Sequence, residues 1–174
     1  TTTLTSSVGS TLFCAELGIF LNNQMNDFTI KSGHPNIYGL IGGEVNSIQA
    51  EKRMLSSMSP TIIEKNNNFY MALGTPGGST IITSVIQTIL NVHEFSMGME
   101  ESVNSPRFHH QLFPDVIRIE KNKFNEVLLI DLENDGYDLE IVPPYGRVDG
   151  ILALEDGCLE GGSDNRGNDY AIGF

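Results

Sequence analysis

The 174-residue chain carries 10 Lys and Arg against 22 Asp and Glu, a formal net charge of −12, and 40% of it is apolar. A chain of this length buries about two thirds of its unfolded surface, so we expect one compact domain. An acidic surface repels phosphate backbones and anionic membranes, which argues against a nucleic-acid partner, and no stretch is long enough to span a bilayer. Cys14 and Cys158 fit no CxxC pattern. We expect buried free thiols, with a disulfide as the alternative.

The first third of the chain alternates short apolar segments with polar loops. Residues 3–5 indicate an extended segment, and residues 18–21 indicate a short buried strand. The polar run 22–28 follows that strand directly. Glycines and a proline surround Tyr38 within residues 32–43, which is typical of a loop with hinge points.

Regular elements are expected in the rest of the chain. Residues 61–65 and 69–73 flank three asparagines, the pattern of a β-hairpin. Residues 79–92 have the apolar spacing of a helix with one broad buried face, and Ser79 or Thr80 can cap its start. The later elements are expected in this order: helices over 97–104 and 124–134, the second stopped by Gly136, then strands near 139–142 and 150–154. Strands, then helices, then strands define an α+β class with sheet and helices in layers.

Two pairs of small residues suggest a site for chemistry on an acyl group. Ser56-Ser57 precedes the first hairpin strand, and Gly77-Gly78 opens directly into the helix after the hairpin. Two adjacent glycines at a helix start expose backbone N–H groups in a place that favours negative charge. Directed at a tetrahedral oxyanion, each such donor contributes about 3 kcal/mol in acyl transfer. A polar turn and a plain tight turn are the alternatives for the two pairs taken alone.

The polar run after the first apolar strand is a candidate cation site. Asn22, Asn23, Gln24 and Asp27 combine one carboxylate with several neutral acceptors. This is the set of groups that holds an α-ammonium group. A solvated loop is the alternative.

Two later motifs favour structural roles. His109 and His110 are adjacent and therefore point apart, and no carboxylate or thiol lies at ligand spacing, so no metal site is assigned. Residues 161–167 are interpreted as a capped turn with an internal pair between Asp164 and Arg166. The glycine-rich segments match neither the dinucleotide-binding nor the phosphate-loop spacing, so nucleotide binding is unsupported.

Five motifs follow one another along the chain: Leu21–Phe28, Leu55–Pro60, Gly74–Ser79, Pro106–Gln111 and Ser163–Arg166. Together they resemble the small subunit of the γ-glutamyltranspeptidases, or glutathione hydrolases, over essentially the whole chain. The resemblance implies an N-terminal nucleophile hydrolase with αββα layers. In that family a precursor cleaves itself, and the freed N-terminal Thr attacks a γ-glutamyl amide. The acyl-enzyme then passes the γ-glutamyl group to water, an amino acid or a dipeptide.

The resemblance also implies catalytic roles. Gly77 and Gly78 match the oxyanion-hole pair, and Thr3 matches a threonine that hydrogen-bonds to the nucleophile. No metal or organic cofactor is implied. The partner implied is a large subunit from the same precursor, which supplies an Arg to the substrate carboxylate.

Substrate-binding roles follow from the same resemblance. Ser56 and Ser57 match the serines that hold the α-carboxylate of the γ-glutamyl group. Gln24 and Asp27 match acceptors for its α-ammonium. Tyr38 lies in the loop that resembles the family's lid.

Two positions depart from the family's pattern. Thr5 stands where many members have an Asn that reaches the substrate amino group, so the grip on that group is expected to differ. Counted back from Asn22 without a gap, Thr1–Thr5 fall on the strand after the nucleophile's own strand. We therefore expect residues 1–174 to be a small subunit that lacks its first strand. Thr1, whose own amine could act as base, is kept only as the lesser alternative for the nucleophile.

Three hypotheses follow. The leading one is a γ-glutamyl acyltransferase and hydrolase that acts on glutathione-like amides, periplasmic or secreted by resemblance. The second keeps the chemistry and changes the substrate, to poly-γ-glutamate or a cephalosporin-type compound; Tyr38 in its lid-like loop favours small substrates. The third is an inactive homologue or binding module that keeps the γ-glutamyl site without a nucleophile.

Overall fold

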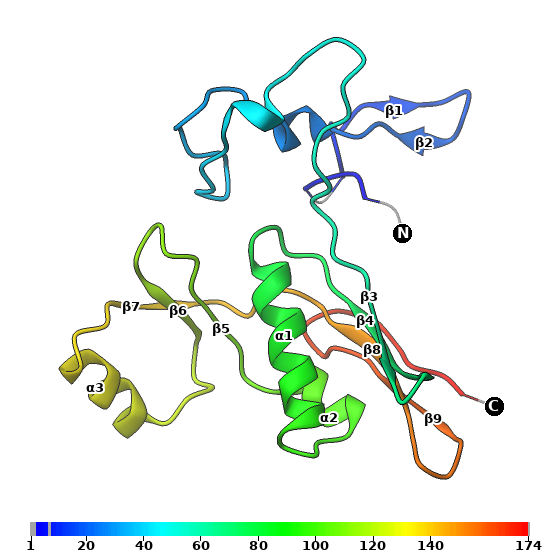
Figure 1. Ribbon diagram of the computed structural model, residues 1–174, viewed down its shortest axis with the longest axis vertical. Coiled ribbons are helices and arrows are strands. Elements are labelled where there is room, and N and C mark those ends of the chain that lie inside the picture. Colours follow the sequence, from blue (N-terminus) through cyan, green and yellow to red (C-terminus); the bar gives the residue numbers. More distant parts are fainter. Residues whose placement is uncertain (1–2, 7, 174) are drawn as a thin grey trace. The chain divides into compact units, whose positions relative to one another are not determined.

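A computed structural model describes residues 3–6 and 8–173, and Figure 1 shows its course. The chain divides into two compact units, residues 1–58 and 59–174. We expected one compact domain; two units form because the cluster of buried apolar side chains lies wholly in the second. Thr1, the alternative nucleophile, lies outside the described residues.

The first unit consists of short elements joined by loops. Strands β1 (Phe13–Cys14) and β2 (Ile19–Phe20) pair antiparallel, and two 3-10 turns follow, η1 (Gln24–Asp27) and η2 (Glu44–Asn46). The strand expected over residues 18–21 is present, but the prediction that it is buried is wrong: 48% of Ile19 is exposed. Among the described residues of this unit, Phe28 is the only buried large apolar side chain. Hydrogen bonds therefore hold most of this unit together.

A four-stranded antiparallel sheet organises the second unit. Its strands are β3 (Thr61–Lys65), β4 (Asn68–Gly74), β8 (Asp149–Ala153) and β9 (Leu159–Gly162), and they lie in that order across the sheet. Asn66 and Asn67, at φ 55° and 63°, form the two-residue turn between β3 and β4. Asparagine tolerates positive φ at both central positions of such a turn, and the predicted hairpin is confirmed.

Helices α1 (Thr80–His93) and α2 (Met99–Asn104) pack against this sheet (Figure 1). The core between them is built from apolar side chains of both layers: Met71, Leu73, Ile81, Val85, Val92, Met99, Val103, Val148 and Leu152. Gly162 allows the close approach of α2, because a Cβ there would lie 2.7 Å from the carbonyl carbon of Met99. The sheet and its helices thus form one tightly packed layer pair.

The start of α1 differs from the prediction. Ser79 has helical dihedral angles, φ −63° and ψ −24°, and its side chain makes no cap hydrogen bond. The hydroxyl of Thr80 donates to the carbonyl oxygen of Gly77 at 2.9 Å instead of accepting from a backbone N–H. Neither residue is therefore the predicted cap, since a capping side chain must accept from the first turn.

A second, three-stranded sheet lies in the same unit. Strands β5 (Phe108–His109), β6 (Ile117–Glu120) and β7 (Leu139–Val142) lie in that order, with β6 and β7 parallel. Helix α3 (Glu126–Asn134) connects β6 to β7, and Gly136, at φ 91°, ends it as predicted. Asn125 caps its start by accepting from the Val127 N–H at 2.8 Å.

Candidate functional site

The turn between β4 and α1 presents two backbone N–H groups. Gly77 has φ 148° and Gly78 has φ 59°, conformations that residues with a Cβ rarely adopt. Within residues 3–6 and 8–173, neither N–H donates a hydrogen bond. Gly77 is exposed and Gly78 is half-buried, so both donors are open to a bound group.

Threonine hydroxyls on both sides hold this turn in place. Thr75 Oγ1 donates to the carbonyl oxygen of Pro76 at 2.6 Å and accepts from the Arg147 N–H at 2.9 Å. Thr80 Oγ1 donates to the carbonyl oxygen of Gly77. The carbonyl oxygens of Pro76 and Gly77 thus accept hydrogen bonds within the turn, while the N–H groups of the two glycines stay available. An oxyanion requires such free donors.

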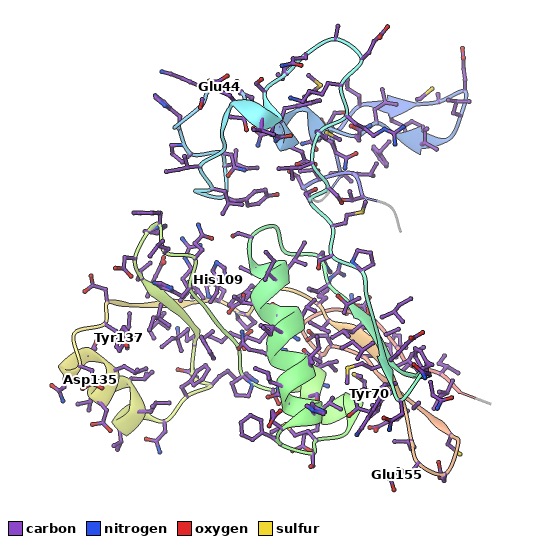
Figure 2. All side chains as sticks on the ribbon, viewed as in Figure 1. Glu44, Tyr70, His109, Asp135, Tyr137 and Glu155 are labelled. Atoms are coloured by element: carbon purple, nitrogen blue, oxygen red, sulfur yellow. The ribbon has the colours of Figure 1, made fainter. Side chains whose placement is uncertain are left out.

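A buried histidine ties the first turns of α1 to β5. His109 is 2% exposed, and Figure 2 shows it beside α1. Its Nδ1 lies 2.8 Å from Thr83 Oγ1, and its Nε2 lies 2.9 Å from Gln111 Oε1. His110 pairs instead with the exposed Asp115, 2.8 Å between Nε2 and Oδ1. The two imidazoles have different partners, and sequence reasoning predicted none of the contacts with Thr83, Gln111 and Asp115.

In the first unit, folding brings Asp27 and Ser57 together. The Ser57 hydroxyl donates to Asp27 Oδ2 at 2.9 Å, although 30 residues separate the two. Gln24 begins and Asp27 ends the same 3-10 turn, and both are half-buried. The Ser56 hydroxyl accepts from the Met58 N–H at 3.3 Å. The predicted ammonium acceptors and the serine pair therefore lie in one region of this unit.

The remaining predicted residues lie in loops of the same unit. Thr3 Oγ1 accepts from the Thr5 N–H at 3.3 Å, and Thr5 has φ 56°. The carbonyl oxygen of Leu4 accepts from the Asn23 N–H, which ties this segment to the polar run. The N–H of Tyr38, in the lid-like loop, donates to the side chain of Asn36 at 2.9 Å.

Four charged side chains form a buried cluster in the second unit. Arg107 Nη2 lies 2.6 Å from Asp164 Oδ2, and Arg166 contacts both Asp164 at 3.0 Å and Glu120 at 2.6 Å. Exposure is 2% for Arg107 and 1% for both carboxylates. The predicted pair of Asp164 and Arg166 is confirmed. It is part of an electrically neutral network that joins Arg107, directly before β5, to Glu120 at the end of β6 and to the turn over residues 161–167.

The cluster favours the charged forms of Asp164 and Arg166, whereas burial and the neighbouring Arg166 lower the pKa of Arg107. Burial alone would raise the pKa of Asp164, but N–H groups of Arg166 and Val148 and the Arg107 guanidinium outweigh it, and the pKa is lowered. Burial alone would lower the pKa of Arg166, but hydrogen bonds to Glu120 and Asp164 raise it above its ordinary value. The network is therefore held by paired charges, whose loss is costly in a desolvated site.

Other predictions concern cysteines, metals and membranes. Cys14 and Cys158 both carry free thiols, but Cys14 is half-buried and Cys158 exposed, so the expected burial is wrong. Across residues 3–6 and 8–173, no three His, Cys, Asp or Glu side chains gather as metal ligands. No helix in this described part is long and apolar enough to cross a membrane.

Comparisons with known proteins agree on one family. The family model described as gamma-glutamyltranspeptidase matches residues 1–174. The glutathione hydrolase proenzyme of Escherichia coli is 43% identical over 175 residues, which cover 100% of this chain and 30% of that relative. A crystal structure of an acivicin-inhibited γ-glutamyltranspeptidase superimposes with a TM-score of 0.91 at 45% identity, covering 97% of this chain and 92% of that one. The Bacillus anthracis transpeptidase CapD, TM-score 0.72 at 21% identity, shares the fold alone.

The mixed helix and strand content is the predicted α+β class, and the solved neighbours place the chain among the N-terminal nucleophile hydrolases. Within that class, the chain belongs to the γ-glutamyltranspeptidase family. It spans 30% of the length of the Escherichia coli relative.

Proposed function

We propose that the chain is the small subunit of a γ-glutamyltransferase and glutathione hydrolase. It cleaves γ-glutamyl amides such as glutathione and passes the γ-glutamyl group to water, amino acids or dipeptides. The lengths support the subunit assignment: the chain covers 30% of the Escherichia coli proenzyme but 92% of one chain in a solved relative.

The contact between Ser57 and Asp27 carries the substrate assignment. An α-amino-acid head group bears an ammonium and a carboxylate on one carbon, so its site needs an anionic acceptor and neutral donors side by side. Asp27 Oδ2 and Ser57 Oγ, 2.9 Å apart, are such a pair. Asp27 and Gln24 then accept from the ammonium. The Ser56 hydroxyl donates to the carboxylate, and the Ser57 hydroxyl turns from Asp27 to the carboxylate when substrate binds, because a hydroxyl has a single donor.

The chemistry is acyl transfer through a threonine ester. The Thr hydroxyl attacks the γ-carbonyl carbon, and the carbonyl oxygen takes the negative charge as the tetrahedral intermediate forms. The N–H groups of Gly77 and Gly78 donate to that oxygen. The C–N bond then breaks, and the leaving amine takes the proton that the nucleophile gave up. Water or a second amine then attacks the carbonyl carbon of the ester. The threonine oxygen leaves and takes back a proton from the attacking group.

We place the nucleophile on a strand before residue 1, as the spacing in front of Asn22 indicates, and keep Thr1 as the lesser alternative. Thr3 is proposed to hydrogen-bond to the nucleophile, and Thr5 to make a weaker contact with the substrate amine than an Asn would. Tyr38 is proposed as a lid residue.

The partner is proposed to be a large subunit from the same precursor, in the periplasm or outside the cell. Large apolar side chains exposed on the chain support such a partner. On α1, Ile82 is 69% and Ile86 52% exposed, one helical turn apart on the same face. In the first unit, Val45 is 92% and Ile30 69% exposed. Exposure of this extent favours burial against another chain.

The test uses the mature heterodimer made from the full-length precursor, assayed with γ-glutamyl-p-nitroanilide and with glutathione. We expect release from both substrates and a higher KM in Ser57→Ala and Asp27→Asn. Failure to release either product would support the inactive homologue. N-terminal sequencing of the small chain identifies the nucleophile, and faster cleavage of poly-γ-glutamate than of glutathione would favour the alternative substrate.

A further inference from the structure

We infer that Asn46 is a positioning residue that sets the geometry of the γ-glutamyl head-group site from both sides. This inference rests on the proposed function of Asp27 and Ser57. Asn46 ends the 3-10 turn η2, which begins at Glu44, labelled in Figure 2. No property of the sequence pattern singled it out.

All four polar groups of Asn46 are engaged, and three of them reach outside its own turn. Its Nδ2 donates to the carbonyl oxygen of Asp27 at 2.7 Å, and its Oδ1 accepts from the Leu55 N–H at 3.0 Å. Its carbonyl oxygen accepts from the Thr29 N–H at 2.9 Å, and its own N–H donates to the carbonyl oxygen of Gly43 at 3.2 Å. One half-buried side chain thus joins the backbone of the ammonium acceptor to the segment that carries the serines.

The two ends of this bridge lie next to the residues that contact the substrate in the proposed function. Asp27 is itself an acceptor for the ammonium, and Leu55 directly precedes Ser56 and Ser57. Lys52 reinforces the bridge, because its Nζ donates to the carbonyl oxygens on either side of Asn46, those of Val45 at 2.6 Å and Ser47 at 3.0 Å. Asn46 therefore joins the two segments through their backbones, in addition to the direct hydrogen bond from Ser57 to Asp27.

A positioning role is required because the described residues of the first unit form no cluster of buried apolar side chains that could hold these loops. Phe28 is the only buried large apolar side chain among the described residues of this unit. Without the Asn46 amide, the backbone at Asp27 and the segment at Leu55 lose their common anchor. Asp27 and the serine pair would then no longer be held at the spacing that binds the ammonium and the carboxylate of one substrate molecule.

The experiment measures how well the mature heterodimer distinguishes three chromogenic p-nitroanilides. Glutaryl-p-nitroanilide lacks the α-amino group, and 4-aminobutanoyl-p-nitroanilide lacks the α-carboxylate. The preference for the γ-glutamyl compound over each, as a ratio of kcat/KM values, measures the ammonium and carboxylate contacts separately. We expect Asn46→Ala to lower both preferences by about tenfold, mainly through KM, as loss of a charge-positioning hydrogen bond implies.

Asn46→Asp sharpens the test and serves if Asn46→Ala fails to fold. The carboxylate keeps an acceptor for the Leu55 N–H but cannot donate to the carbonyl oxygen of Asp27. We therefore expect the ammonium preference to fall and the carboxylate preference to be kept. Asn125→Ala, which removes a comparable side-chain bond to backbone from the start of α3, should change neither preference.

Two outcomes overturn the inference. If kcat/KM falls equally for all three substrates in both Asn46 variants, Asn46 is merely structural. If kcat/KM is unchanged for all three, Asn46 has no positioning role. Asp27→Asn separates this result from the proposed function. If Asp27→Asn lowers the ammonium preference while the Asn46 variants do not, the inference alone fails. If Asp27→Asn leaves that preference unchanged, the proposed function fails and the inference with it.

Discussion

The two units of the chain hold their candidate functional groups by different kinds of interaction. In residues 59–174, the turn that carries Gly77 and Gly78 belongs to a unit that has both a cluster of buried apolar side chains and a neutral cluster of buried charges. In residues 1–58, hydrogen bonds between side chains and backbone hold Asp27 and Ser57, with Phe28 as the one large apolar side chain buried among the described residues.

The difference matters because the two proposed sites, the oxyanion donors and the head-group site, have different requirements for rigidity. An oxyanion donor gains from being fixed before the reaction, since reorganisation would cost part of its benefit. A head-group site must admit and release the substrate, and local opening is easiest where few apolar contacts are lost. We therefore expect mutations in the second unit to affect stability or kcat, and mutations in the first to affect KM.

The largest effect is expected from Asp164→Ala. The change leaves the buried guanidinium of Arg107 without its carboxylate and the Val148 N–H without its acceptor. Breaking a buried ion pair by removing one partner costs about 3–5 kcal/mol in the free energy of unfolding. Urea denaturation of the mature heterodimer measures this value. The control is Glu140→Ala, which removes a partly exposed pair with Arg118 and should cost no more than about 1 kcal/mol. An equal fall in the free energy of unfolding in both variants would show that the buried cluster contributes no more to stability than a surface pair.

The next effect concerns catalysis and uses Gly78→Ala. A Cβ at φ 59° strains the turn and moves the N–H donors. Loss of one oxyanion donor lowers kcat by about 10²–10³-fold, and KM should change little. Gly136→Ala introduces similar strain at φ 91°, in open space after α3, and should leave kcat unchanged. A drop in kcat in both variants would point to general destabilisation rather than to the donors.

A smaller effect is expected from pH, through the same buried cluster. The pKa of Asp164 in the folded chain lies below its ordinary value of 3.8. As the pH falls, the unfolded chain therefore binds this proton first, and the stability that Asp164 contributes is lost progressively below 3.8, through the folded pKa. Unfolding free energies measured between about pH 5 and pH 2 should fall more steeply in the wild type than in Asp164→Asn. Parallel curves would mean that protonation of Asp164 is not linked to folding.

Local signals explain which parts of the fold could be predicted. The hairpin followed from Asn66 and Asn67, α1 from its apolar spacing, and the end of α3 from Gly136. Each of these depends on residues close together in the chain. Strands β5, β6 and β9 were not predicted, because they are two to four residues long and exist through pairing with distant segments. Burial of Ile19 was wrong because a two-residue strand has no core to face.

The sequence suggests which residue types could form the candidate site, but not which of these residues are in contact. Carboxylate, amide, hydroxyl and glycine were chosen for what each can bind. Which of them touch depends on long-range folding. The bond from Ser57 to Asp27 spans 30 residues, and the bond from Asn46 to Asp27 spans 19. No local pattern encodes such a distance, so Asn46 was found only from the structure.

The smallest effect tests whether the turn in the second unit also depends on hydrogen bonds. Thr83→Val keeps the side chain's shape but removes the hydroxyl that lies 2.8 Å from His109 Nδ1. A buried ring nitrogen then loses its partner, which costs about 1–3 kcal/mol, at the lower end here because Thr83 itself is only half-buried. The melting temperature should fall in Thr83→Val and recover in Thr83→Ser, which restores the hydroxyl without the methyl group. If kcat falls in Thr83→Val and recovers with the serine, the link from β5 to α1 also positions the glycine donors. If Thr83→Val is as stable as the wild type while Thr83→Ser is destabilised, packing of the methyl group and not the histidine contact holds α1 at this point.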